Sequence, residues 1–244
     1  MYKHIRAVAL RTVRYNDTKA ILTAWSAELG RISLLLPATD SRESRRRRAL
    51  TMPMSLFEGE VDVRPGRDIL SVRDMRAAAV TPSLSADFRK ATVAMFMAEC
   101  LDSMLREAAV GDEALWELIR ETVTGLDLST DPAAIANTHL WFLYRLCALT
   151  GVEPDSATYR PGRLFDLRSG TFRDSAPGHT DYVEAAQAPF LVALARLTPR
   201  TLHLMHLTAD ARNAALDLIL RYCSLHALTP GPLNTLSVLR SLFR

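Results

Sequence analysis

The sequence concentrates arginine in one short segment. Arg42, Arg45, Arg46, Arg47 and Arg48 place five arginines within seven residues. A guanidinium group stays charged at every physiological pH and pairs with phosphate through two parallel hydrogen bonds. A loop that carries several such groups neutralises several phosphates and releases their counterions. The segment therefore predicts binding to a nucleic-acid backbone, against the alternative of a solvated charged loop that has no partner.

Further cations in the same part of the chain extend this prediction. We expect contacts to DNA from Arg11, Arg14, Lys19, Arg31, Arg64 and Arg67. Residues 1–80 hold 15 Lys and Arg against 9 Asp and Glu, whereas the remaining residues hold 15 against 18. The N-terminal third is therefore basic, although the formal charge of the whole chain is only +3. A basic region favours a polyanionic partner. Each of these cations, taken alone, is equally suited to a surface ion pair.

Two aromatic residues lie among these cations. Tyr15 and Trp25 are of the type that stacks on exposed bases in proteins that bind single strands. Trp25 stands in the middle of an apolar segment, where packing in a core is the favoured interpretation.

The sequence predicts no enzymatic or metal chemistry. His203 and His206 have the spacing of one helical face, but no third ligand accompanies them, and a zinc site needs three or four. Cys100, Cys147 and Cys223 are far apart, which is typical of buried apolar cysteines and not of a disulfide framework or a zinc site. A glycine-rich phosphate loop, a nucleophile elbow and paired carboxylates are all missing from the sequence. We therefore expect a protein that is not an enzyme and that has no cofactor and no metal.

The elements that must position the cations are strands. The alternating or apolar pattern of the first 80 residues predicts five of them, at 4–15, 18–26, 31–36, 57–63 and 69–75. The segment Arg64-Pro65-Gly66-Arg67 has the residue order of a type II turn between the last two. Five short strands with tight turns predict an OB-fold barrel, with the arginine run between its third and fourth strands.

From Leu84 onward the pattern changes to that of helices. We expect helices at 88–105, 112–126 and 132–149, a return to helix from 182, and a last helix at 236–243. Asp131 and Pro132 have the order of an N-cap and a first helical residue. The predicted fold is α+β with two domains: a five-stranded OB-fold barrel at 1–80, and an all-helical domain at 81–244. The non-helical insertion at 151–177 contains a short β-hairpin at 164–172.

The N-terminal 20 residues have no uninterrupted apolar segment of the kind found in signal peptides. The apolar runs of the chain are also far shorter than a membrane span. The sequence therefore predicts a cytoplasmic protein, associated with the nucleoid and not with a membrane.

The sequence resembles the RecO family over nearly its whole length. The segment 7–18 is similar to the first strand pair of that family, and 29–33 is similar to its Gly-Arg strand start. The arginine run occupies the position of the family's basic loop. The segments 203–213 and 236–243 resemble C-terminal parts of RecO proteins from Bacteroidetes-like bacteria.

This resemblance implies a recombination mediator that acts in DNA repair. Such a protein binds single- and double-stranded DNA, anneals complementary strands and forms a complex with RecR. It also contacts the acidic C-terminal tail of single-stranded-DNA-binding protein and so helps RecA, indirectly, to load onto coated DNA. Two other classes remain as alternatives: a nucleic-acid-modifying enzyme with an OB recognition domain, and a scaffold whose barrel binds protein and not DNA.

The sequence also departs from the family pattern. Many members have a four-cysteine zinc motif in the region that matches 151–177, but here that region has no cysteine, so zinc is not carried over. The basic loop lacks the family's glycine-rich form, since Pro37 and Ala38 precede it. For the partner tail, the sequence predicts an apolar groove with a cationic rim, for which the candidates are Arg89, Lys90, Arg145 and Arg221.

Overall fold

The computed structural model describes residues 1–38, 48–106, 110–226, 228 and 230–243. The chain forms two compact units. The first, here called the barrel unit, contains Met1–Leu128 and Leu233–Leu239; the second, the helical unit, contains Ser129–Pro232 and Arg240–Arg244. The first helices of the chain thus belong to the same compact unit as the barrel, whereas the sequence predicts a domain boundary after residue 80. That boundary stays a prediction.

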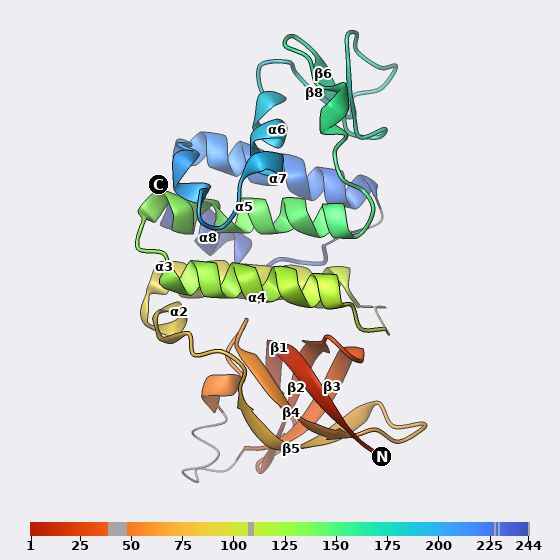
Figure 1. Cartoon of the computed structure of the whole chain (residues 1–244), viewed down its shortest axis with the longest axis vertical. Coiled ribbons are helices and arrows are strands. Elements are labelled where there is room, and N and C mark those ends of the chain that lie inside the picture. The colour runs from red at the N-terminus through yellow and green to blue at the C-terminus, as the bar shows by residue number, and fades with distance from the viewer. Residues whose placement is uncertain (39–47, 107–109, 227, 229, 244) are drawn as a thin grey trace. The chain divides into compact units, whose positions relative to one another are not determined.

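Five strands form a closed barrel, drawn from red to orange in Figure 1. They are β1 (Tyr2–Arg14), β2 (Lys19–Ser26), β3 (Gly30–Pro37), β4 (Leu56–Asp62) and β5 (Ile69–Ala77). The strand order β1-β2-β3-β5-β4 includes one parallel pair, between β3 and β5, and is that of an OB-fold. The five-stranded barrel predicted from the sequence is confirmed, with strand ends that differ from the predicted ones by a few residues.

The barrel interior follows the alternation of the strands. Leu22 and Ala24 on β2 lie in the core together with Ile32, Leu34 and Leu36 on β3. Successive residues of a strand face opposite sides, so the residues between these positions face outward. A β-bulge between Ala9 and Arg11 interrupts the alternation on β1, after the part of β1 that pairs with β4.

The barrel unit also contains the helices α2 (Pro82–Ala86), α3 (Phe88–Met104) and α4 (Glu113–Leu128). Helix α3 packs against β1. Lys90 of α3 is only 4% exposed, and its Nζ donates to Ser83 Oγ at 2.7 Å and to the carbonyl oxygen of Asp127 at 2.6 Å. This buried ammonium group therefore ties the three helices together. The sequence did not predict α2, because Pro82 reads as a break and not as the first residue of a one-turn helix.

The helical unit is built around α5 (Pro132–Leu149), which contacts α6 (Pro189–Arg196), the short 3-10 helix η2 (Leu202–Leu204) and α7 (Ala209–Leu225). Asp131 accepts a hydrogen bond from the backbone N–H of Ala134 at 2.9 Å, so the predicted N-cap is confirmed. Residues around most of α5 are buried, as expected of a central helix. The last helix, α8 (Leu236–Leu242), contains the division between the two units.

A small three-stranded sheet accompanies these helices, with the order β7-β6-β8. Strands β6 (Leu164–Asp166) and β7 (Thr171–Arg173) form the hairpin that the sequence predicts, after a 3-10 helix, η1 (Ser156–Thr158). The prediction that helix resumes at Tyr182 is wrong: Tyr182–Val183 is strand β8, which pairs with β6, and the next helix begins at Pro189. A strand of two residues is too short to show a period. Within the described residues, no helix is long and apolar enough to cross a membrane.

Candidate nucleic-acid interface

Three of the predicted contact residues lie at the end of the β1–β2 pair that β4 does not reach, here called the β1–β2 extension. The pairing of β1 with β4 ends at Val8, whereas its pairing with β2 continues to Arg14. Arg11, Arg14 and Lys19 are all exposed on this extension, where β3 continues the sheet through the pairing of Lys19 with Pro37. The fold therefore brings three cations, which the sequence placed on two strands, to one end of the sheet.

Lys19 faces outward beside a row of apolar side chains that the sequence analysis did not single out. Val13, Ile21 and Leu35 are direct cross-strand neighbours on β1, β2 and β3, and Ile69 of β5 pairs with Ser33, two residues before Leu35. Val13 is 46% and Ile69 is 39% exposed, and the other two are half-buried. We call these four residues the apolar strip. It lies on the outer face of β2 and β3, the face with which OB-folds bind oligonucleotides.

The turn between β4 and β5 contributes the other predicted cations. Gly66 has φ +75°, and the N–H of Arg67 donates to the carbonyl oxygen of Arg64 at 3.3 Å, as expected for the type II turn. Arg64 is engaged with Asp62 at 2.6 Å. Arg67 is exposed and, like Lys19, forms no ion pair within the described part of the chain. Among the predicted contact residues that the structure describes, these two are therefore the cations most accessible to a phosphate.

Two further predicted cations are held by one carboxylate. Arg31 donates to Asp102 of α3 at 2.6 Å, and Arg11 lies 3.3 Å from the other oxygen of the same group. Arg14 pairs with Asp17 at 3.1 Å in a contact that is exposed on both sides. An exposed ion pair such as that of Arg14 contributes little stability, so a phosphate can replace its carboxylate.

The arginine run lies mostly outside the described residues: this holds for Arg42, Arg45, Arg46 and Arg47. The residues on either side of it are described. The N–H of Ala38 donates to the carbonyl oxygen of Thr18 at 2.7 Å, next to Lys19, and Arg48 helps to line a hollow together with Arg11. The described residues on both sides of the run therefore lie beside cations of the β1–β2 extension.

The two aromatic residues differ in whether they are accessible for stacking on bases. Trp25 is 1% exposed, so packing in a core is confirmed and base stacking by this residue is excluded in this conformation. Tyr15 is 62% exposed at the β1–β2 turn and is available for stacking.

Of the four rim candidates, the prediction of Lys90 is wrong, because its ammonium group is buried and donates two hydrogen bonds to neighbouring helices of the barrel unit. Arg89 pairs with Asp87 at 2.8 Å, and Arg221 pairs with Asp181. Arg145 is partly exposed. A solvent-facing lysine and a buried one are alike in sequence, and only the packing of the helices distinguishes them.

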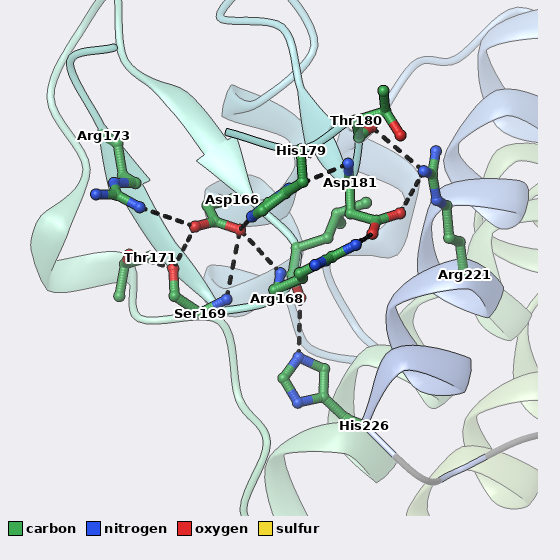
Figure 2. Close-up of polar contacts among 11 residues, drawn as sticks. Asp166, Arg168, Ser169, Thr171, Arg173, His179, Thr180, Asp181, Arg221 and His226 are labelled. Atoms are coloured by element: carbon green, nitrogen blue, oxygen red, sulfur yellow. Dashed lines mark hydrogen bonds and ion pairs between the residues drawn. The ribbon is translucent and has the colours of Figure 1, made fainter. Parts of the chain in front are cut away.

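A second polar cluster occupies the three-stranded sheet of the helical unit (Figure 2). Asp166 at the end of β6 is 2% exposed and accepts hydrogen bonds from the N–H of Arg168 at 2.9 Å, the hydroxyl of Ser169 at 2.9 Å and the guanidinium of Arg173 at 3.2 Å. Burial raises the pKa of Asp166, but these donors outweigh it and hold the pKa below its ordinary value. The carboxylate is therefore charged and saturated with partners.

The same cluster includes His179 and Asp181 (Figure 2). The N–H of Asp181 donates to His179 Nδ1 at 3.2 Å, which leaves Nε2 to carry the proton that faces Asp166 at 3.5 Å. Asp181 in turn accepts from Arg168 at 2.7 Å and from Arg221 of α7. The cluster thus connects β6, the following turn, β8 and α7, in the region where the sequence lacks the family's zinc motif.

The described residues contain no group of three or more His, Cys, Asp or Glu that could hold a metal ion. Cys100, Cys147 and Cys223 are buried free thiols, as the sequence predicts, and the sulfur atoms of Cys147 and Cys223 lie 3.0 Å apart between α5 and α7. His203 and His206 are both exposed.

Comparison with known proteins adds independent findings. The chain matches a family described as Recombination protein O N terminal over residues 1–80, and one described as Recombination protein O C terminal over residues 85–234. It is 30% identical to the DNA repair protein RecO of Bacteroides fragilis and 31% identical to that of Phocaeicola vulgatus, in each case over 97% of both chains. It is also 29% identical to the DNA repair protein RecO of Porphyromonas gingivalis, over 98% of both chains.

Proposed function

Because the chain belongs to the RecO family, whose members are recombination mediators without enzymatic activity, we propose that its barrel binds the DNA backbone through the outer face of β2 and β3. The observation that carries this proposal is the accessible pair Lys19 and Arg67, which stand two residues before Ile21 and Ile69 of the apolar strip. Cations at the edges neutralise phosphates, and apolar side chains between them fit the bases of an unpaired strand.

The proposal includes the annealing of complementary strands. Two single strands repel each other through their phosphates, and cations that screen this repulsion lower the barrier to pairing. The arginine run, which ends at Arg48 beside the β1–β2 extension, supplies such screening. No bond is made or broken in this process, so the chain needs no catalytic group.

The proposed partners follow from the family. They are single- and double-stranded DNA, RecR, and the acidic C-terminal tail of single-stranded-DNA-binding protein, with RecA affected indirectly when it loads onto the DNA. The proposed place of action is the cytoplasm, at the nucleoid. A tail with carboxylates and apolar side chains needs an apolar hollow, and the helical unit has one of about 250 Å³, lined by Phe190, Leu207, Ala211 and Ala215.

The test is fluorescence anisotropy with labelled single-stranded DNA over a salt series. We compare the wild type with two variants: Arg45, Arg46, Arg47 and Arg48 all changed to Ala, and Arg14, Lys19 and Arg67 all changed to Ala. Each lost phosphate contact lowers the slope of log affinity against log salt by about one unit, so we expect decreases of up to about four and about three. Arg120→Ala, in an exposed pair with Glu117 on α4, is the matched control and should leave the slope unchanged.

Annealing is measured separately, from the rate at which two complementary labelled oligonucleotides pair in the presence of each variant. The variants that bind DNA weakly should also anneal slowly. If both cation variants bind DNA as tightly as the wild type does, the scaffold alternative, in which the barrel binds protein, is favoured.

A further inference from the structure

One carboxylate of α3 engages two arginines of the barrel. Oδ1 of Asp102 accepts a hydrogen bond from Arg31 at 2.6 Å, and Oδ2 lies 3.3 Å from Nε of Arg11. All three residues belong to the barrel unit. The cluster contains two positive charges and one negative charge, so it retains one net positive charge after pairing.

The two arginines differ in how firmly they are held. The side chain of Arg31 is 24% exposed, and its Nε is buried and finds no hydrogen-bond partner among the described residues. The side chain of Arg11 is 58% exposed, and its contact to Asp102 is the longer of the two. Arg31 therefore anchors the carboxylate, whereas the contact to Arg11 is the one that another anion can replace.

There is room for such an anion beside Arg11. A hollow of about 440 Å³ is lined by Arg11, Asp102, Arg48 and Met95, among others. The other acidic residue that lines it, Glu99, already accepts hydrogen bonds from the N–H of Thr235 at 3.0 Å and from its hydroxyl at 2.6 Å. The hollow thus has two guanidinium groups at its wall, with Asp102 as the carboxylate that competes for one of them.

We propose that Asp102 is an intramolecular competitor for the DNA phosphate at Arg11, and that it thereby sets the affinity of the barrel for DNA. A carboxylate and a phosphate oxygen present the same acceptor to a guanidinium group. The inference rests on the proposed function, because it requires that the β1–β2 extension contacts DNA. Competition of this kind keeps the binding weak enough for a mediator to release the strand.

A purely structural role for Asp102 predicts the opposite sign. If the carboxylate served only to hold Arg11 in position for DNA, its removal would weaken binding. Competition requires that its removal strengthens binding. The direction of the change in affinity therefore decides between the two roles.

The experiment measures the affinity of Asp102→Asn for single-stranded DNA by anisotropy over a salt series. One additional phosphate contact steepens the salt slope by about one unit and raises affinity about fivefold to tenfold near 0.1 M salt. Glu117→Gln is the matched control, because it removes the same charge from an exposed pair on α4. We expect a change of less than about twofold from that control, since it adds no contact. The double variant Arg11→Ala with Asp102→Asn should lose the gain.

A second measurement does not depend on the folding of the Asp102 variant. Because Asp102 already offsets part of the charge of Arg11, Arg11→Ala should lower DNA affinity less than Lys19→Ala, whose side chain has no ion pair in the described structure. A larger loss from Arg11→Ala overturns the inference, as does equal or weaker binding by a folded Asp102→Asn. Failure of the wild type to bind DNA overturns the proposed function itself, and the inference with it.

Discussion

Arginine and aspartate are paired in two regions of this protein, to opposite effect. On the barrel extension, the side chains of Arg14 and Asp17 are 71% and 100% exposed, and besides this contact Arg14 donates to the carbonyl oxygen of Asn16 at 3.3 Å. In the three-stranded sheet, Asp166 is 2% exposed and is surrounded by donors from the backbone, a hydroxyl and a guanidinium. The same residue types therefore make an exchangeable contact in one place and a fixed one in the other.

Burial is the physical reason for this difference. An exposed pair is screened by water and contributes between about 0 and 1 kcal/mol, so a phosphate replaces the carboxylate at little cost. A buried carboxylate cannot lose its partners without remaining charged in a medium that solvates it poorly. The barrel extension is thus suited to binding, and the cluster around Asp166 to holding β6, β8 and α7 together.

The largest expected effect comes from breaking the buried cluster. Asp166→Ala leaves two backbone N–H groups and Arg173 without their acceptor, and removal of one partner from a buried charged group costs about 3 kcal/mol. Urea unfolding followed by circular dichroism measures this loss. DNA affinity of the folded variant should be unchanged, because the cluster lies in the helical unit and the proposed interface in the barrel unit.

The control for this experiment is Asp174→Ala. Asp174 also pairs with an arginine of the same region, Arg163, at 2.8 Å, but its side chain is 78% exposed. Asp174→Ala should therefore lower the free energy of unfolding much less than Asp166→Ala does. Equal losses from the two variants would contradict the view that burial separates the two kinds of pair.

The pH dependence of folding stability tests the same comparison between buried and exposed pairs, with a smaller expected effect. The pKa of Asp166 and that of Asp181 both lie below the ordinary value of 3.8, the latter because Arg221 and Arg168 donate to its carboxylate. A lowered pKa in the folded state means that the charged form stabilises the fold. This contribution is complete above the ordinary value and is lost as the pH falls through the lowered one.

We therefore expect the difference in unfolding free energy between the wild type and Asp166→Ala to be constant from neutral pH down to about pH 5, and to shrink below about pH 4. Urea unfolding at a series of pH values measures it. A difference that grows on acidification would mean that Asp166 is protonated in the folded protein.

The two regions also differ in how far the sequence predicts them. The barrel strands follow from local patterns, such as the alternation of Phe57, Val61 and Val63 with acidic residues, and Gly66 marks the turn that the structure contains. The apolar strip was missed because its members come from four strands. It forms only through the cross-strand registers and the parallel pairing of β3 with β5, for which the sequence has no local signal.

Carboxylates were the weakest part of the sequence interpretation. Asp102 and Asp166 look like any acidic residue on a polar face. The role of Asp102 arises from Arg31, which is 71 residues away, and that of Asp166 from its burial, since Arg173 is only 7 residues away. Long-range ion pairs and burial both depend on packing, which single-sequence patterns do not contain. Arginines were easier to find because they are clustered in the sequence itself.

The smallest expected effect tests whether the barrel face contacts bases or only phosphates. Val13→Ser and Ile69→Ser each remove part of an exposed apolar side chain, so each should lower the affinity for single-stranded DNA only about twofold to threefold, at an unchanged salt slope. Duplex affinity should stay the same, because paired bases are stacked and cannot reach the strip. Val80→Ser, at a position that is 83% exposed between β5 and α2, is the matched control. An equal loss of affinity for duplex DNA would show that the strip supports the cations that bind the backbone and does not contact bases. The outer face would then distinguish single strands from duplex by their charge density alone.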